Sequence, residues 1–124
     1  MVQRDVTLSS LFDVRRKLGE LIVSWSPDPE ADPATQNTQR EQLNALILER
    51  DQINGAINAV IATEFAGIPS PALAQATQDL QVSAEKLDAL GKTIAEINDV
   101  LKIADAVLQG AAMVIKLATG GLPV

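Results

Sequence analysis

The chain has 124 residues, 47% of them hydrophobic and 21% charged, which are the length and composition of one soluble globular domain. It contains no Cys and no His, which excludes a disulfide framework, a thiol nucleophile, a Ser-His-Asp triad and a Cys- or His-ligated metal site. The net charge is −6, with sixteen acidic and ten basic residues, and this sign is opposite to the charge that nucleic acid binding requires.

Aromatic residues make up only 2% of the chain, so its core must be aliphatic and rich in Ala, which favours helices over sheets. The first predicted helix runs from about Val6 to Trp25. An apolar residue recurs in it at every third or fourth position, at Leu11, Val14, Leu18, Leu21 and Trp25. This spacing places the five side chains on one face of a helix. The basic run at residues 15–17 is interpreted as part of the solvent-facing side.

The second predicted helix follows a Pro-rich stretch at residues 26–32, which is expected to be an extended, solvated linker. Asp32 is a typical N-cap residue, and Pro33 occupies the one helical position that needs no amide donor. The helix is expected to reach Ala66, with Gly67 as its C-terminal cap. Its predicted seam consists of Leu43, Leu46, Arg50, Ile53, Ile57, Val60 and Glu64.

The third predicted helix spans residues 71–119, between Ser70-Pro71 and Gly120-Gly121. The three-four spacing continues through this span at Leu80, Ser83, Leu87, Leu90, Ile94, Ile97, Leu101, Ala104, Leu108, Ala111, Ile115 and Ala118. Such a sustained repeat predicts one long, coiled-coil-like helix. Gly91 and Gly110 are the candidate positions for a kink.

The predicted fold is therefore all-α and occupies residues 1–124 as one domain: a long antiparallel helical hairpin plus an N-terminal helix, in a coiled-coil-like bundle. At 1.5 Å per residue the third helix would be about 70 Å long and the second about 50 Å. Residues after about Asp105 are expected to project beyond the second helix, because the two cannot match end to end.

The projecting segment is the most hydrophobic part of the sequence, and Lys116 is its only charged residue. Three partners could bury it: the N-terminal helix, a second copy of the chain, or a membrane. We expect a self-association or partner surface formed by Val107, Leu108, Ala111, Val114, Ile115 and Ala118. The segment has about 14 helical residues, or about 21 Å, which is short of the ~30 Å hydrocarbon core of a bilayer.

These patterns favour a non-catalytic structural or protein–protein interaction module of bacterial type. It is expected to form a homodimer or to bind another helical protein, and to bind neither nucleic acid nor a cofactor or metal. The N-terminus lacks the apolar stretch of a signal peptide, so we expect a cytoplasmic protein. The alternative is a membrane-active helical protein, such as a toxin or pore component, that uses the apolar C-terminal segment.

Overall fold

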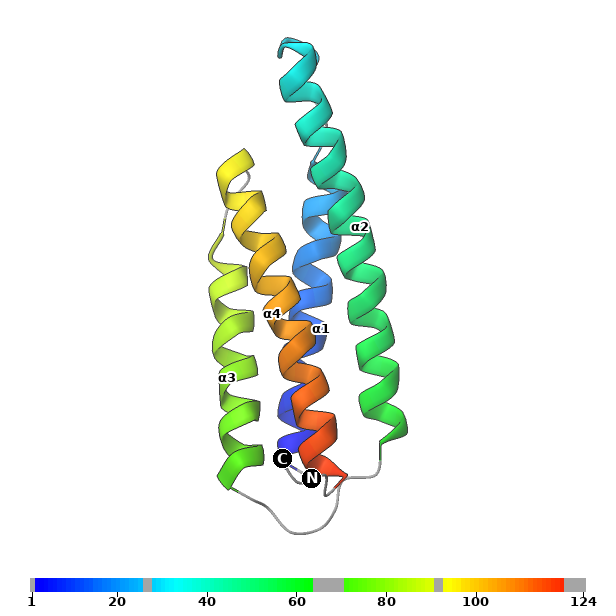
Figure 1. Cartoon of the computed structure of the whole chain (residues 1–124), viewed down its shortest axis with the longest axis vertical. Coiled ribbons are helices and arrows are strands. Elements are labelled where there is room, and N and C mark those ends of the chain that lie inside the picture. The colour runs from blue at the N-terminus through cyan, green and yellow to red at the C-terminus, as the bar shows by residue number, and fades with distance from the viewer. Residues whose placement is uncertain (1, 26–27, 64–70, 91–92, 120–124) are drawn as a thin grey trace.

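The structure is a computed structural model that describes residues 2–25, 28–63, 71–90 and 93–119. Within these ranges the chain forms four helices and no strand, as Figure 1 shows: α1 (Val2–Ser24), α2 (Pro33–Ala62), α3 (Pro71–Asp88) and α4 (Ile94–Ala118). The prediction of an all-α bundle is confirmed.

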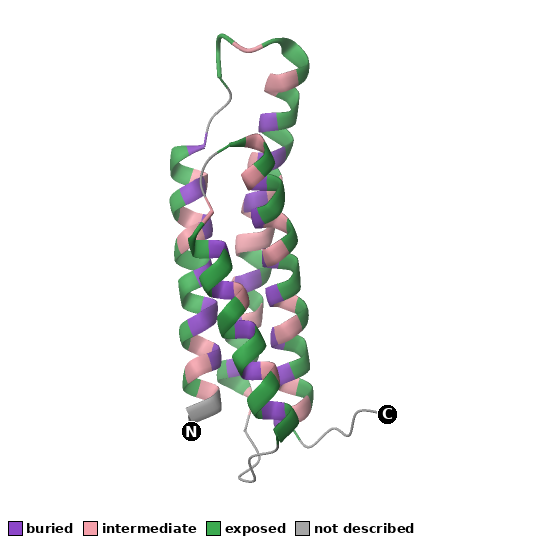
Figure 2. Cartoon of the chain, turned by 90° about the vertical axis from the view of Figure 1, so that its left-hand side faces the viewer, coloured by how far each residue is buried: buried purple, intermediate pink, exposed green. Residues whose placement is uncertain are grey.

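The bundle consists of two antiparallel hairpins, α1 with α2 and α3 with α4 (Figure 1). α1 packs against α2 and α3, while α4 packs against α3 and α2, so α1 and α4 lie diagonally across the bundle. Consequently α1 runs parallel to its neighbour α3, and α2 runs parallel to α4. The first turns of α2 extend beyond the ends of the other three helices (Figures 1 and 2).

The core is aliphatic, as the composition predicts, and its buried positions face the interior of the bundle (Figure 2). The predicted stripe on α1 is confirmed, because all five of its members are buried: Leu11, Val14, Leu18, Leu21 and Trp25. On α2 the seam is confirmed at Leu46, Ile53, Ile57 and Val60. Each fully buried aliphatic side chain stabilises the fold by roughly 1.5–3 kcal/mol.

The start of α2 is also as predicted. The Asp32 side chain accepts a hydrogen bond from the Thr35 backbone N–H at 2.8 Å, and Pro33 occupies the first turn. The hydrogen bonds from Thr35 lower the pKa of Asp32. A local capping signal of this kind is readable in a sequence because all its partners lie within one turn.

The segment before α2 is exposed, but its described part makes a turn at residues 28–31 and only Asp32 is extended, which corrects the prediction of an extended linker. The Asp28 Oδ1 atom accepts a hydrogen bond from the Glu30 N–H at 2.9 Å, and the Asp28 carbonyl accepts one from the Ala31 N–H at 3.1 Å. The Gln39 Oε1 atom accepts a hydrogen bond from the Asp28 N–H at 2.9 Å. The chain therefore makes a turn that is anchored on α2, because an Asp side chain readily replaces a backbone partner.

The end of α2 comes earlier than Ala66, since the last helical residue is Ala62 and Thr63 is the C-cap. The Arg4 guanidinium donates to the Ile61 carbonyl at 2.9 Å, which satisfies one of the free carbonyls at this helix end. The remaining features predicted for this end, namely Glu64, Gly67 and the turn at 68–69, lie outside the described residues.

The single helix predicted for residues 71–119 is instead two helices, α3 and α4. α3 ends at Asp88, and α4 begins after Thr93, whose side chain accepts a hydrogen bond from the Glu96 N–H at 3.1 Å. The Thr93 hydroxyl also lies 3.0 Å from the Glu96 carboxylate. This Thr-x-x-Glu pattern is a helix start, which apolar spacing alone does not register. Gly91, one candidate kink, lies outside the described residues.

Because the chain reverses direction between α3 and α4, the C-terminal segment does not project beyond α2 as the single long helix implied. α4 lies beside both α3 and α2, so one face of the segment after Asp105 is packed within the chain itself, at Val107, Ala111, Val114 and Ala118. Gly110, the other candidate kink, lies inside the continuous helix α4.

Candidate functional site

The predicted self-association surface falls largely in the core of the chain itself. Four of its six residues are at most 1% exposed: Val107, Ala111, Val114 and Ala118. Leu108 and Ile115 are half-buried and pack against the same core. Most of this surface is therefore already covered within the chain, because α2 and α3 pack against the apolar face of α4 that a continuous 71–119 helix would have left open.

The described residues contain no group of three or more acidic side chains arranged to hold a metal ion. No helix among them is both long enough and apolar enough to cross a membrane.

A groove of about 310 Å³ lies between the parallel helices α1 and α3. We call it the α1–α3 groove and define it by its lining residues. Those from α1 are Asp5, Val6, Ser9, Ser10, Asp13 and Arg16, and those from α3 are Gln81, Ala84, Glu85 and Asp88. Its volume is at the lower end of the range for sites that bind small molecules or single side chains.

The groove exists because short side chains occupy the inward positions of both helices. Ser10 on α1 is 4% exposed and Ala84 on α3 is 6% exposed. Protein interiors are normally filled to crystal-like density. Two short side chains at a helix contact leave a space that a pair of Leu residues would close.

The Ser10 hydroxyl makes no hydrogen bond to another described residue, and the oxygen keeps some contact with solvent. Its side chain is more than nine-tenths buried and lines the groove. A ligand atom in the groove could supply the missing partner.

The charge of the groove is strongly negative. Four carboxylates line it, from Asp5, Asp13, Glu85 and Asp88, against the single guanidinium of Arg16. The two walls carry two carboxylates each. A cation between the walls would therefore be attracted from both sides.

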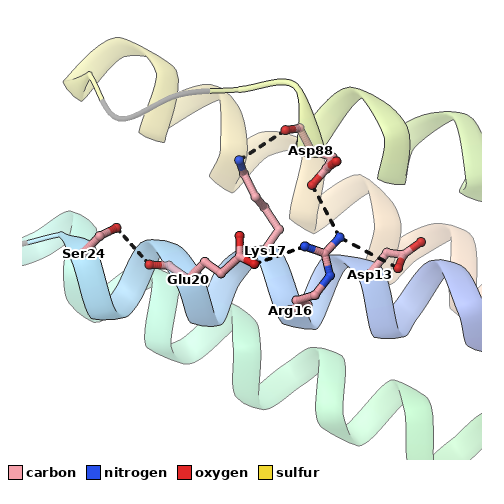
Figure 3. Close-up of polar contacts among 6 residues, drawn as sticks. All are labelled: Asp13, Arg16, Lys17, Glu20, Ser24 and Asp88. Carbon is pink, nitrogen blue, oxygen red and sulfur yellow. Dashed lines mark hydrogen bonds and ion pairs between the residues drawn. The ribbon is translucent and has the colours of Figure 1, made fainter.

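Arg16 stands at one end of the groove and links its two walls (Figure 3). Its Nη1 atom donates to the Glu20 carboxylate at 3.1 Å, whereas its Nη2 atom is 4.0 Å from Asp13 Oδ1 and 3.7 Å from Asp88 Oδ1. The Lys17 ammonium donates to the Asp88 backbone carbonyl at 3.2 Å. These contacts tie the C-terminal end of α3 to the middle of α1.

The basic run at residues 15–17 is thus not only a solvent-facing surface. The Arg15 guanidinium donates to Asn54 Oδ1 on α2 at 3.0 Å and lies 4.9 Å from the centre of the Phe12 ring. Arg15 therefore contacts α2, while Arg16 and Lys17 contact α3. Sequence spacing could not assign these partners, because they depend on which helices flank α1.

A second polar cluster lies between α2 and α4 and was not predicted. Gln42 is 4% exposed, and its Nε2 atom donates to the Ile94 carbonyl at 2.9 Å and to Asn98 Oδ1 at 3.0 Å. Glu49 on α2 and Asp105 on α4 lie seven residues after Gln42 and Asn98, respectively. Burial raises the pKa of Glu49, and the nearby Asp105 charge raises it further. The cluster links two parallel helices in register, so we interpret it as part of the packing.

The chain matches no protein-family model, no curated protein and no solved structure. In the α1–α3 groove, Asp5, Ser9 and Asp13 follow one another at four-residue spacing on α1. Glu85 and Asp88 recur on α3. On either helix alone this pattern is typical of a solvated face, and only the fold brings the two faces together.

Proposed function

We propose that the chain is a non-catalytic, cytoplasmic interaction module that binds a basic segment of a partner protein in the α1–α3 groove. The observation that carries the proposal is the α1–α3 groove itself, which is lined by two carboxylates from each helix and by the Ser10 hydroxyl. Basic side chains complement both features, because they are cationic and carry several hydrogen-bond donors.

The net charge of the chain supports a basic partner rather than a second copy. Each copy carries a charge of −6, so two copies repel one another, whereas a basic segment is attracted from a distance. The C-terminal surface predicted for self-association is not retained, since most of it lies in the core.

The size of the groove limits the segment that it can take. The lining residues on α1 run from Asp5 to Arg16, a length of about 16 Å at 1.5 Å per residue. An extended peptide covers this distance with about five residues. A short basic stretch is therefore long enough to pass both carboxylates on each wall.

The groove supports binding better than catalysis. Ser10 has no hydrogen bond to a general base among the described residues, and the chain contains no His. An activated serine requires such a base within hydrogen-bond reach. Binding requires only the charge and shape that the groove already has.

The proposal is tested by titrating the ¹⁵N-labelled protein with a six-residue peptide of alternating Arg and Gly, and with the matching Glu and Gly peptide. We expect only the basic peptide to shift the NMR signals of the backbone amides that line the groove. Its binding should weaken at higher salt. Shifts spread evenly over α2 and α4, or none at all, would overturn the proposal.

Charge variants supply the matched control. Changing Asp5→Asn together with Glu85→Gln removes one carboxylate from each wall and should weaken binding about tenfold, corresponding to roughly 1.4 kcal/mol. Changing Glu41→Gln together with Asp99→Asn removes the same total charge from exposed positions on α2 and α4. If both pairs weaken binding equally, the effect is one of net charge and the groove is not the site.

A further inference from the structure

The chain's own guanidinium is held loosely between the two walls of the α1–α3 groove. Arg16 makes one short contact, to Glu20 at 3.1 Å. Its distances to Asp13 and Asp88 are 4.0 Å and 3.7 Å, beyond hydrogen-bond length. All of these side chains are more than half exposed, so the ion pairs contribute little to stability. Asp13 and Asp88 thus keep most of their capacity to accept hydrogen bonds.

The unpaired Ser10 hydroxyl lies in the same groove, and it is independent of the ion pairs. It is located one helical turn before Asp13 on α1. A ligand group that bonds to Ser10 and to carboxylates on both walls needs several donors pointing in different directions. A guanidinium has five N–H donors in a flat, fixed fork, whereas an ammonium is a compact point charge.

We infer that the α1–α3 groove recognises an arginine side chain of the partner, and that Arg16 competes with it for Asp13 and Asp88. This inference rests on the proposed function and names the side chain that the site selects. The incoming guanidinium lies between the two walls and donates to both carboxylates, with Ser10 accepting one further N–H. Arg16 keeps its short contact to Glu20 and gives up its two long ones.

The choice of arginine is tested with two peptides of the same sequence, one with Arg and one with Lys at every basic position. We expect the Arg peptide to bind about fivefold more tightly, because only the fork reaches both walls at once. Equal affinity of the two peptides would overturn the selection of arginine but would leave the binding of basic segments standing. Absence of binding by both would overturn the proposed function as well.

The competition is tested with Arg16→Gln, which frees Asp13 and Asp88 and removes a positive charge from the groove. We expect this variant to bind the Arg peptide about threefold or more tightly than the wild-type chain does. Arg40→Gln makes the same charge change at an exposed position on α2 and should have a smaller effect. Weaker binding to Arg16→Gln, with an unchanged melting temperature, would show that Arg16 assists the ligand, and the competition would be wrong.

The contribution of the Ser10 hydroxyl to binding is tested with Ser10→Ala, which nearly keeps the size of the side chain. We expect about threefold weaker binding of the Arg peptide and no loss of stability in the free protein, since Ser10 has no partner to lose among the described residues. A purely structural role would lower the melting temperature and leave the affinity unchanged. That result would remove Ser10 from the site and overturn the geometry inferred for the bound guanidinium.

Discussion

Gly110 of α4 lies so close to Leu80 of α3 that a Cβ atom on the glycine would come within 3.3 Å of the Leu80 Cδ1 atom. The contact is tighter than ordinary van der Waals packing, and it marks the point where the two helices of the second hairpin approach one another. Gly55, in the middle of α2, has no atom within 4 Å of the corresponding position. The same residue type therefore has two different roles in this fold.

The first prediction follows from this contrast. Gly55→Ala should stabilise the protein by about 0.5–1 kcal/mol, because alanine restricts the unfolded chain and favours the helix without meeting any neighbour. Gly110→Ala gains the same propensity but must displace Leu80, so its net effect should be smaller or destabilising. Urea denaturation of both variants provides the comparison. Equal stabilisation would show that Leu80 moves freely and that the close approach does not constrain α4.

Local signals account for the parts of the fold that the sequence predicts well. The apolar stripe on α1 and the Asp32-Pro33 start of α2 depend only on residues within a few turns of one another. The reversal between α3 and α4 escapes detection because the apolar spacing continues through it, from Leu87 to Ile97, and both are fully buried. The Thr93 cap is a local sign of a new helix that the apolar spacing does not reveal.

The α1–α3 groove could not be predicted, because its two walls are distant in the sequence: the nearest lining residues, Arg16 on α1 and Gln81 on α3, are 65 positions apart. Neither wall is unusual as a sequence, and the basic run beside it has partners on two different helices. Buried polar residues escape detection for a related reason. Gln42 resembles a surface residue until the α4 backbone and Asn98 are placed beside it.

The second prediction concerns two isoleucines with the same chemistry and different burial. Ile97→Ala should cost about 2–4 kcal/mol, since Ile97 is fully buried and its removal leaves a cavity. Ile61→Ala, at a position that is 50% exposed, should cost less than about 1 kcal/mol. Chemical denaturation checks both values. Costs within error of one another would mean that α4 is rotated from the orientation described.

The third prediction tests how the turn before α2 is held. Gln39→Ala removes the acceptor of the Asp28 N–H but keeps the Gln39 carbonyl, to which the Trp25 indole N–H donates at 3.2 Å. We expect the Asp28 amide to exchange with solvent about tenfold faster, while the fluorescence of Trp25 remains that of a buried indole. Thr38→Ala, on an exposed neighbouring position, is the control. Unchanged exchange in the Gln39 variant would show that other contacts hold the turn.

The last prediction is a pH dependence of stability caused by Glu49. Burial and the Asp105 charge raise its pKa above the ordinary value of 4.5, so the folded state binds the proton more tightly than the unfolded state does. The ionised form therefore costs stability, and the cost is fully present at pH values above the raised pKa. As the pH falls through the raised pKa toward 4.5, Glu49 becomes protonated and the cost disappears.

Glu49→Gln removes this charge at every pH, so the variant should be more stable than the wild type near neutral pH. The difference between the two melting temperatures should shrink as the pH is lowered, and it should approach its minimum below pH 4.5. Glu41→Gln, at an exposed position on the same helix, should give a difference that varies less with pH. If the difference between the melting temperatures of the wild type and Glu49→Gln stays constant across the acidic range, the Glu49 carboxylate is solvated and Asp105 does not act on it.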